Sequence, residues 1–155
     1  MSIREKLGNT RLYLDGSMGT MLQSLGLGPG ELPERWNLHH AETVRAVHRA
    51  YFDAGSNVVC TNTFGASRLK FEADELAAIV TAAVANARAA AQESQAPQEK
   101  YVALDIGPLG KLLKPYGDLD FEDAVSIFAE TVDIGVRCGV DLIVIETMND
   151  SYETK

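Results

Sequence analysis

The sequence lacks several features that would place the protein in a membrane or secreted class. It contains no apolar run near the roughly 20 residues that a membrane-spanning helix requires. Its first residues include no apolar stretch typical of a secretory signal. The two cysteines, Cys60 and Cys138, form no CxxC motif, which excludes a disulfide-held scaffold. We therefore expect a soluble, cytoplasmic protein with no membrane partner.

Positive charge is also scarce. The 155 residues include 14 Lys and Arg against 22 Asp and Glu, which gives a formal net charge of -8. Nucleic-acid binding requires clustered Lys and Arg, so we expect no nucleic-acid partner. The remaining composition is ordinary for a soluble α/β protein, and the length fits one domain or part of a larger one.

Four short apolar runs predict β-strands. Each is rich in Val, Ile, Leu or Tyr, and each is too short for a helix. Runs of this kind are typical of strands buried on both faces in a parallel sheet. They are residues 11–15 (RLYLD), 57–61 (NVVCT), 101–105 (YVALD) and 141–146 (DLIVIE).

Helical periodicity lies between these runs. Apolar side chains recur at helical spacing over residues 44–54, 76–91 and 121–132. Gly55 stands where a C-terminal cap of the first helix belongs, and Asp120 stands at the N-cap of the third. Alternating strands and helices predict a parallel sheet with right-handed crossovers.

The number of βα units predicts half of a larger fold. A complete (β/α)8 TIM barrel has about 250 residues, whereas this chain carries four units in 155 residues. A fourth helix would begin near Asp150, but the residues after it are too few to form it. We therefore expect residues 1–155 to be the first four βα units of such a barrel, a fragment with no second domain. The alternative is a complete small open-sheet domain.

Polar side chains follow each predicted strand. In a barrel these strand ends converge on one face, where barrel enzymes carry out their chemistry. Asp15 and Glu146 are candidates for binding a cation such as a substrate ammonium, because a carboxylate ending an apolar strand requires a partner. The alternative is that they bind backbone amides or cap helices. The strand ends are Asp15-Gly16-Ser17, Thr61-Asn62-Thr63, Asp105 and Glu146-Thr147.

The loop after the first predicted strand, DGSMGT, contains Gly16 and Gly19. Glycine permits close backbone approach, so exposed N–H groups there could hold an anionic group such as a carboxylate. The loop is neither a GxGxxG motif nor a P-loop, so it does not indicate a nucleotide. The alternative is a simple turn.

Histidine and cysteine do not form a metal-ligand pattern. His40 and His48 are eight residues apart, and no further His or Cys lies at ligand spacing. We expect the histidines to be surface or capping residues. We expect Cys60 in a strand and Cys138 at a helix end to be small buried apolar residues.

Five motifs in this order carry a resemblance to a known family. They are DGSMGTMLQ (15–23), ERWNL (34–38), TNTFGAS (61–67), DIGPLG (105–110) and DLIVIETMND (141–150). Together they resemble the homocysteine-binding S-methyltransferase domain, in the form found as the N-terminal module of cobalamin-dependent methionine synthases. The resemblance covers nearly the whole chain.

The resemblance implies a (β/α)8 barrel that binds zinc and makes methionine. The metal would hold the homocysteine sulfur as a thiolate, which attacks a methyl donor, in this form methylcobalamin. The family's zinc ligands are cysteines after the sixth and eighth strands, so they would lie beyond Lys155. Cys60 and Cys138 do not match them. No catalytic residue and no metal ligand is therefore expected within this chain.

The resemblance also implies a substrate site for the amino-acid end of homocysteine. Asp15 and Glu146 would hold the ammonium, and the backbone around Gly16 and Ser17 would face the carboxylate. The expected substrate-binding residues are Asp15, Gly16, Ser17, Thr61, Asn62, Thr63, Phe64 and Glu146.

Three functional hypotheses follow. The first is an enzyme fragment that needs the missing C-terminal half barrel as its partner. The second is a non-catalytic module that assembles with another chain or a second copy through unpaired strand edges. The third is a doubly wound binding domain, which would require a strand order that is not sequential.

Overall fold

The computed structural model describes residues 3–155 and contains a parallel sheet with strands β1 (Val58–Cys60), β2 (Tyr101–Ile106) and β3 (Leu142–Ile145). The strand order is β1-β2-β3, with Val58 beside Tyr101 and Ala103 beside Leu142. The sheet is parallel, as predicted. The sequential order contradicts the doubly wound alternative.

The first predicted strand is not a strand in the structure. Its pairing with β1 is reduced to one parallel bridge between Leu14 and Val58. The Asp15 side chain accepts the N–H of Cys60 at 2.9 Å, so a carboxylate occupies the position that the next backbone carbonyl of a ladder would take. The segment still lies beside β1, and it delivers Asp15 to the carboxyl end of the sheet.

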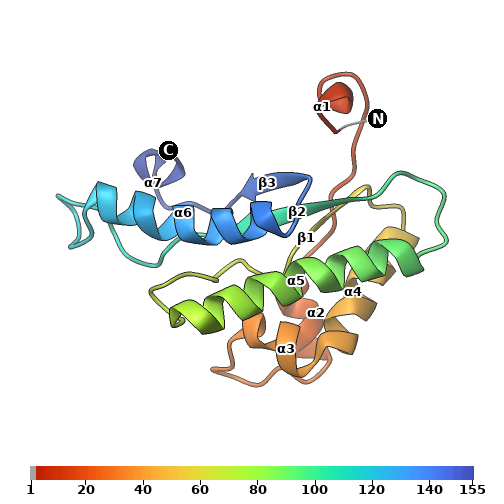
Figure 1. The fold of residues 1–155 in the computed structure, drawn as a ribbon, viewed down its shortest axis with the longest axis horizontal. Coiled ribbons are helices and arrows are strands. Elements are labelled where there is room, and N and C mark those ends of the chain that lie inside the picture. Colours follow the sequence, from red (N-terminus) through yellow and green to blue (C-terminus); the bar gives the residue numbers. More distant parts are fainter. Residues whose placement is uncertain (1–2) are drawn as a thin grey trace.

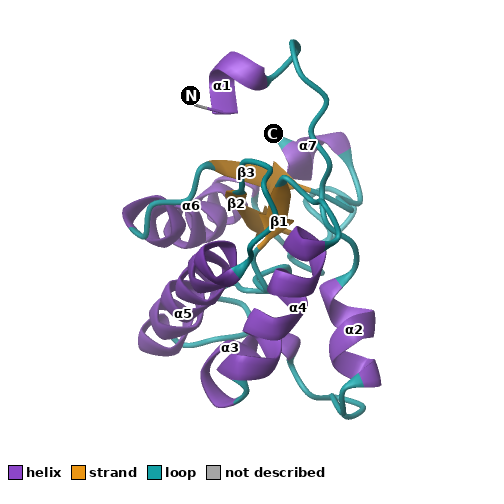
Figure 2. Ribbon diagram, turned by 90° about the vertical axis from the view of Figure 1, so that its right-hand side faces the viewer, coloured by secondary structure: helices purple, strands orange, loops and turns teal. Residues whose placement is uncertain are grey.

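Helices cover one face of the sheet. In Figures 1 and 2, α4, α5 and α6 surround one side of the strands, while α1 and α7 lie toward the other side. The helices are α1 (Ile3–Lys6), α2 (Met18–Ser24), the 3-10 helix η1 (Pro33–Arg35), α3 (Trp36–His39), α4 (Ala41–Asp53), α5 (Ala73–Glu93), α6 (Phe121–Arg137) and α7 (Ser151–Thr154).

The three predicted helices correspond to α4, α5 and α6. Gly55 has a φ of 108° after α4, as expected for a C-terminal cap. Asp120 occupies the N-cap position of α6, but its side chain makes no capping hydrogen bond and instead pairs with Lys114 at 2.9 Å. The expectation that the residues after Asp150 form no helix is wrong. They form the single helical turn α7, and the Asp150 carboxylate accepts two of its N–H groups.

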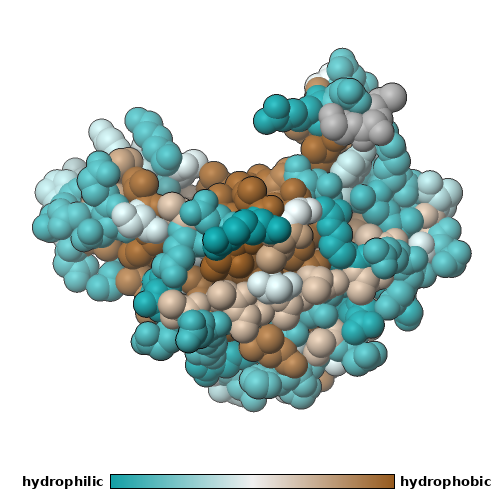
Figure 3. Space-filling model, in the orientation of Figure 1, coloured by the Kyte–Doolittle hydropathy of each residue, from teal (hydrophilic) through white to brown (hydrophobic). Residues whose placement is uncertain are grey.

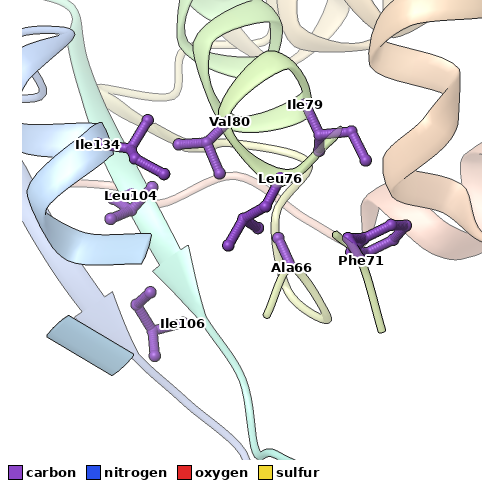
Figure 4. Packing of buried hydrophobic residues seen from close by; sticks show 8 residues of the cluster. All are labelled: Ala66, Phe71, Leu76, Ile79, Val80, Leu104, Ile106 and Ile134. Carbon is purple, nitrogen blue, oxygen red and sulfur yellow. The ribbon is translucent and has the colours of Figure 1, made fainter. Parts of the chain in front are cut away.

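Alternation along β2 separates two faces of the sheet. Leu104 and Ile106 point toward the helices and pack with Leu76, Val80 and Ile134 (Figure 4). Helix α6 approaches closely because it has a glycine at this contact: a Cβ on Gly135 would lie 2.6 Å from the Leu104 side chain. This packing fixes the strands on which the site is built.

The other face is concave and carries a smaller cluster. Val58, Tyr101 and Ala103 are buried there, and Ile3 packs against them from the N-terminal segment.

The helix-facing residues of β3 are less covered than those of β2: Ile143 is 39% and Ile145 is 51% exposed. Figure 3 shows hydrophobic surface gathered around the strands between α7 and α1.

Two expectations about single residues are corrected. His48 is neither a surface nor a capping residue: it is fully buried on α4, and neither ring nitrogen has a hydrogen-bond partner among the described residues. Burial lowers its pKa to about 4. Cys60 lies in β1 and Cys138 at the end of α6, as expected, but both are half-buried rather than buried.

Candidate substrate site

A cavity of about 610 Å³ lies at the carboxyl end of the parallel sheet. Its walls come from the loop after Leu14, from η1, and from the ends of β1, β2 and β3. The structure thus brings the predicted strand ends to one place. Among the predicted site residues, those that line it are Asp15, Gly16, Ser17, Thr61, Asn62, Phe64 and Glu146.

Thr63 is the predicted site residue that does not line this cavity. Its side chain is buried, and its Oγ1 donates to the backbone oxygen of Asp105 at 2.8 Å. It also lies 2.7 Å from the hydroxyl of Thr61. Thr63 therefore joins the loop after β1 to β2, because the turn at residue 62 directs its hydroxyl into the sheet.

Asp15 is a half-buried carboxyl group at the cavity wall. Its Oδ2 accepts the Cys60 N–H, which fixes its orientation. Burial raises the pKa of Asp15 to about 6, and the neighbouring Glu146 carboxylate adds to the rise. The site therefore favours a cation, whose charge would offset both carboxylates.

Gly16 is required by a close approach. A Cβ at this position would lie 2.8 Å from the hydroxyl of Tyr51. That hydroxyl donates to the backbone oxygen of Ser17 at 2.9 Å, and the Ser17 side chain accepts the Thr20 N–H at the start of α2. The loop is therefore more than a simple turn: α4 holds it from behind and α2 continues from it.

Glu34 is a cavity residue that the sequence reasoning did not select. It lines the cavity, is only 4% exposed, and accepts the Gly65 N–H through Oε1 at 2.8 Å. Its Oε2 has no partner among residues 3–155. The Asn37 amide donates to the backbone oxygens of Glu34 and Asn62, which fastens η1 to the loop after β1. The signal for this role was its place in the ERWNL motif.

Asp105 is the second residue that was not selected, although it was recognised as a strand end. It lines the cavity, is 7% exposed, and its Oδ1 has no hydrogen-bond partner among the described residues. Burial and the adjacent Glu146 carboxylate raise the pKa of Asp105 to about 8. Strand alternation was the available signal, because Tyr101, Ala103 and Asp105 share the concave face.

The backbone after Glu146 is unusual. Thr147 has a φ of 56°, which a β-branched residue rarely adopts. Its hydroxyl donates to the Glu146 carboxylate at 3.3 Å. The strained residue thus stands directly beside a cavity carboxylate, a position typical of functional sites.

The cavity is acidic. Among residues 3–155, the side chains that line it include no Lys, Arg or His. Within the same range, no group of three or more His, Cys, Asp or Glu side chains is arranged to hold a metal ion. Cys60 lines the wall, and burial together with Asp15 raises the pKa of its thiol. The residues described do not fit a zinc site.

Comparison with known proteins places the chain in a family. Residues 12–155 match the homocysteine S-methyltransferase family, and the chain therefore belongs to it. It is 29% identical to the methionine synthase of Mycobacterium leprae over 97% of its length, and 31% identical to that of Mycobacterium tuberculosis over 91%. It spans 13% of the length of each of these relatives.

Solved structures show the same fold. The oxidised form of the homocysteine methyltransferase MmuM from Escherichia coli matches 97% of this chain with a TM-score of 0.81 at 24% identity. Its apo form matches 94% with a TM-score of 0.73 at 25% identity. The chain covers 58% and 52% of these structures. In residues 3–155, no helix combines the length and the apolar character needed to cross a membrane.

Proposed function

We propose that this chain binds the amino-acid end of homocysteine. The observation that supports this most directly is the cavity at the carboxyl end of the sheet, which Asp15 and Glu146 both line and which no basic side chain of residues 3–155 lines. An ammonium group is the cation that an amino acid supplies. A buried ammonium paired with carboxylates is held by charge-assisted hydrogen bonds.

The other walls have complementary roles. The backbone around Gly16 and Ser17 would face the substrate carboxylate, away from the acidic strand ends. Thr61, Asn62 and Phe64 would form the pocket beside the substrate chain. The contacts of Asn37 and Glu34 with this loop keep it in place.

We also propose that residues 1–155 are the N-terminal half of a (β/α)8 barrel. The sequential parallel strands and the uncovered Ile143 and Ile145 support this, because the next βα unit of a barrel would cover them. The partner of this chain would then be the C-terminal half barrel.

The complete protein would be a homocysteine S-methyltransferase that forms methionine in the cytoplasm. A zinc ion would activate the homocysteine thiol, and methylcobalamin would supply the methyl group. The described residues fit no zinc site, so we assign this chain substrate binding and no chemical step.

Native mass spectrometry with zinc analysis tests this assignment. The chain is expected to combine with a chain carrying the remaining half of the domain, giving a 1:1 species with one zinc and homocysteine methylation. Methylation by the 16.8 kDa chain alone at the rate of the pair would contradict it.

A non-catalytic assembly module is the second candidate, favoured by the exposed apolar residues at β3. In the same experiment this candidate predicts a zinc-free homodimer that does not bind the C-terminal half barrel.

A further inference from the structure

The cavity holds more acid than its proposed ligand can neutralise. Four carboxyl groups line it, those of Asp15, Glu34, Asp105 and Glu146, and within the described chain no Lys, Arg or His lines it. Homocysteine brings one ammonium and one carboxylate, and therefore no net positive charge. Because buried carboxylates without a cation are costly, some of this charge must be neutralised by a proton.

The four carboxyl groups differ in their hydrogen-bond donors. Asp15 accepts the Cys60 N–H, and Glu34 accepts the Gly65 N–H. Glu146 is exposed and accepts from the Thr147 hydroxyl. Asp105 is only 7% exposed, and its Oδ1 accepts no hydrogen bond from residues 3–155. Asp105 is therefore the group least able to remain ionised.

The strand register places a partner beside it. Asp105 on β2 is opposite Val144 on β3, and Glu146 lies two residues further along the same face. The Glu146 N–H donates to the Ile106 oxygen at 3.0 Å, so the sheet pairing continues up to this residue. Asp105 and Glu146 thus line the cavity from neighbouring strands on one face, and a hydrogen bond between two such carboxyl groups requires a proton, because two carboxylates have only acceptors.

We propose that Asp105 is a further substrate-site residue, which shares one proton with Glu146 in the ligand-free cavity and loses it when an amino-acid ammonium binds. The ligand rests on the proposed function; the shared proton does not. Before binding, one proton lies between the two carboxyl groups. When the ammonium binds, this proton passes to solvent, and both groups bind the ammonium as carboxylates.

The surroundings agree with this exchange. The other titratable groups that line the cavity with Asp105 are Asp15 from the preceding segment, Cys60 from β1, Glu34 from η1 and Glu146 after β3. All are acids, so none supplies a positive charge. Burial and Glu146 raise the pKa of Asp105, and an ammonium would lower it again. Amino-acid affinity should therefore rise with pH through the neutral range.

The shared proton can be read without a ligand. Carbon-13 NMR of side-chain carboxyl groups in the purified chain, with Asp105→Asn for assignment, gives the titration of Asp105. It should titrate well above its ordinary value of 3.8, and Glu146→Gln should move its midpoint down. Glu122→Gln, an exposed change on α6, is the matched control and should not move it. An Asp105 titration midpoint near 4 that is unchanged by Glu146→Gln would overturn the proposal.

Calorimetry with L-methionine then tests the coupling, because this probe has no thiol to titrate. In buffers of different ionisation enthalpy at pH 7, binding should release close to one proton, and Asp105→Asn should abolish the release. Affinity should rise up to about tenfold per pH unit below the midpoint. Binding without proton release would contradict the coupling. Absence of any binding would instead contradict the proposed function, while the NMR titration would still report the shared proton.

Discussion

The helix-packed face of the sheet and the carboxyl end of its concave face are built from the same strands but have opposite chemistry. On β2, Leu104 and Ile106 face α5 and α6 and are surrounded by apolar side chains. Ala103 and Asp105 face the other way, and Asp105 ends in a cavity with three further carboxyl groups. One six-residue strand thus contributes to the core and to the site at alternate positions.

The difference shows where stability and binding are separated. The packed face is apolar and close-packed, so changes there should affect folding. The cavity end gathers a half-buried and a buried carboxyl group, Asp15 and Asp105, whose raised pKa values are unfavourable for folding at neutral pH and favourable for binding a cation. Substitutions at the two places should therefore be distinguishable by their effects.

The largest effect is expected from Leu104→Ala on the packed face. This side chain is fully buried, so its loss leaves a cavity and should cost about 2–5 kcal/mol of unfolding free energy. Urea denaturation measures this cost. Ile143→Ala, on the same face of the neighbouring strand β3 but 39% exposed, is the control and should cost clearly less. Equal losses would show that burial against α5 and α6 does not decide how much a side chain of this face stabilises the fold.

Asp15→Asn and Glu146→Gln should act on binding. Each removes a charged partner of the proposed ammonium, and homocysteine affinity should fall by about 1.5–3 kcal/mol. Calorimetry measures the affinity, and urea denaturation should show no comparable loss of stability. Asp118→Asn, an exposed change outside the cavity, is the control. Unchanged affinity in both variants would remove these residues from the site.

Gly107→Ala should affect both properties, because Gly107 joins the two regions. A Cβ there would lie 2.6 Å from the backbone oxygen of Phe64, whose ring forms part of the cavity wall. Such overpacking typically costs about 1–3 kcal/mol. Gly19→Ala has open space and serves as the control in the same unfolding measurement. Wild-type stability and affinity in Gly107→Ala would contradict this close contact.

At neutral pH the smallest expected effect is that of His48 in the helical layer, because its contribution changes only in acid solution. Burial lowers its pKa from 6.5 to about 4, so the unfolded chain binds its proton first. Stability from this group is present above pH 6.5 and is lost as pH falls toward 4. Thermal unfolding of His48→Leu should lose this part of the acid sensitivity. An identical pH profile in the variant would show that His48 is not buried in neutral form.

Local patterns predicted the elements that follow a period. The spacing of apolar residues located α4, α5 and α6, and short apolar runs located β1, β2 and β3. The segment at residues 11–15 has the composition of a strand, yet the Asp15 side chain replaces a ladder bond after one bridge. The one-turn helices α1, α3 and α7 are too short to show a period.

The residues that line the cavity were predictable where chain order alone decides their position. Residues directly after a strand reach the cavity, as Asp15 and Glu146 do. Thr63 does not, because the course of a loop decides which way each side chain turns. Glu34 comes from η1, which does not follow a predicted strand. Predicting Asp105 required knowing which residues of β2 face the cavity. His48 lies inside an otherwise periodic helix, and tertiary packing decided its burial.

The most direct test of the account is a titration of the isotope-labelled chain with L-homocysteine, followed by NMR, beside 4-mercaptobutanoate, which lacks only the amino group. The account predicts shifts at the backbone of Gly16, Ser17 and Asn62 with homocysteine, and much weaker binding of the analogue. Equal binding of both compounds, or shifts elsewhere on the chain, would contradict a site that recognises the ammonium through Asp15 and Glu146.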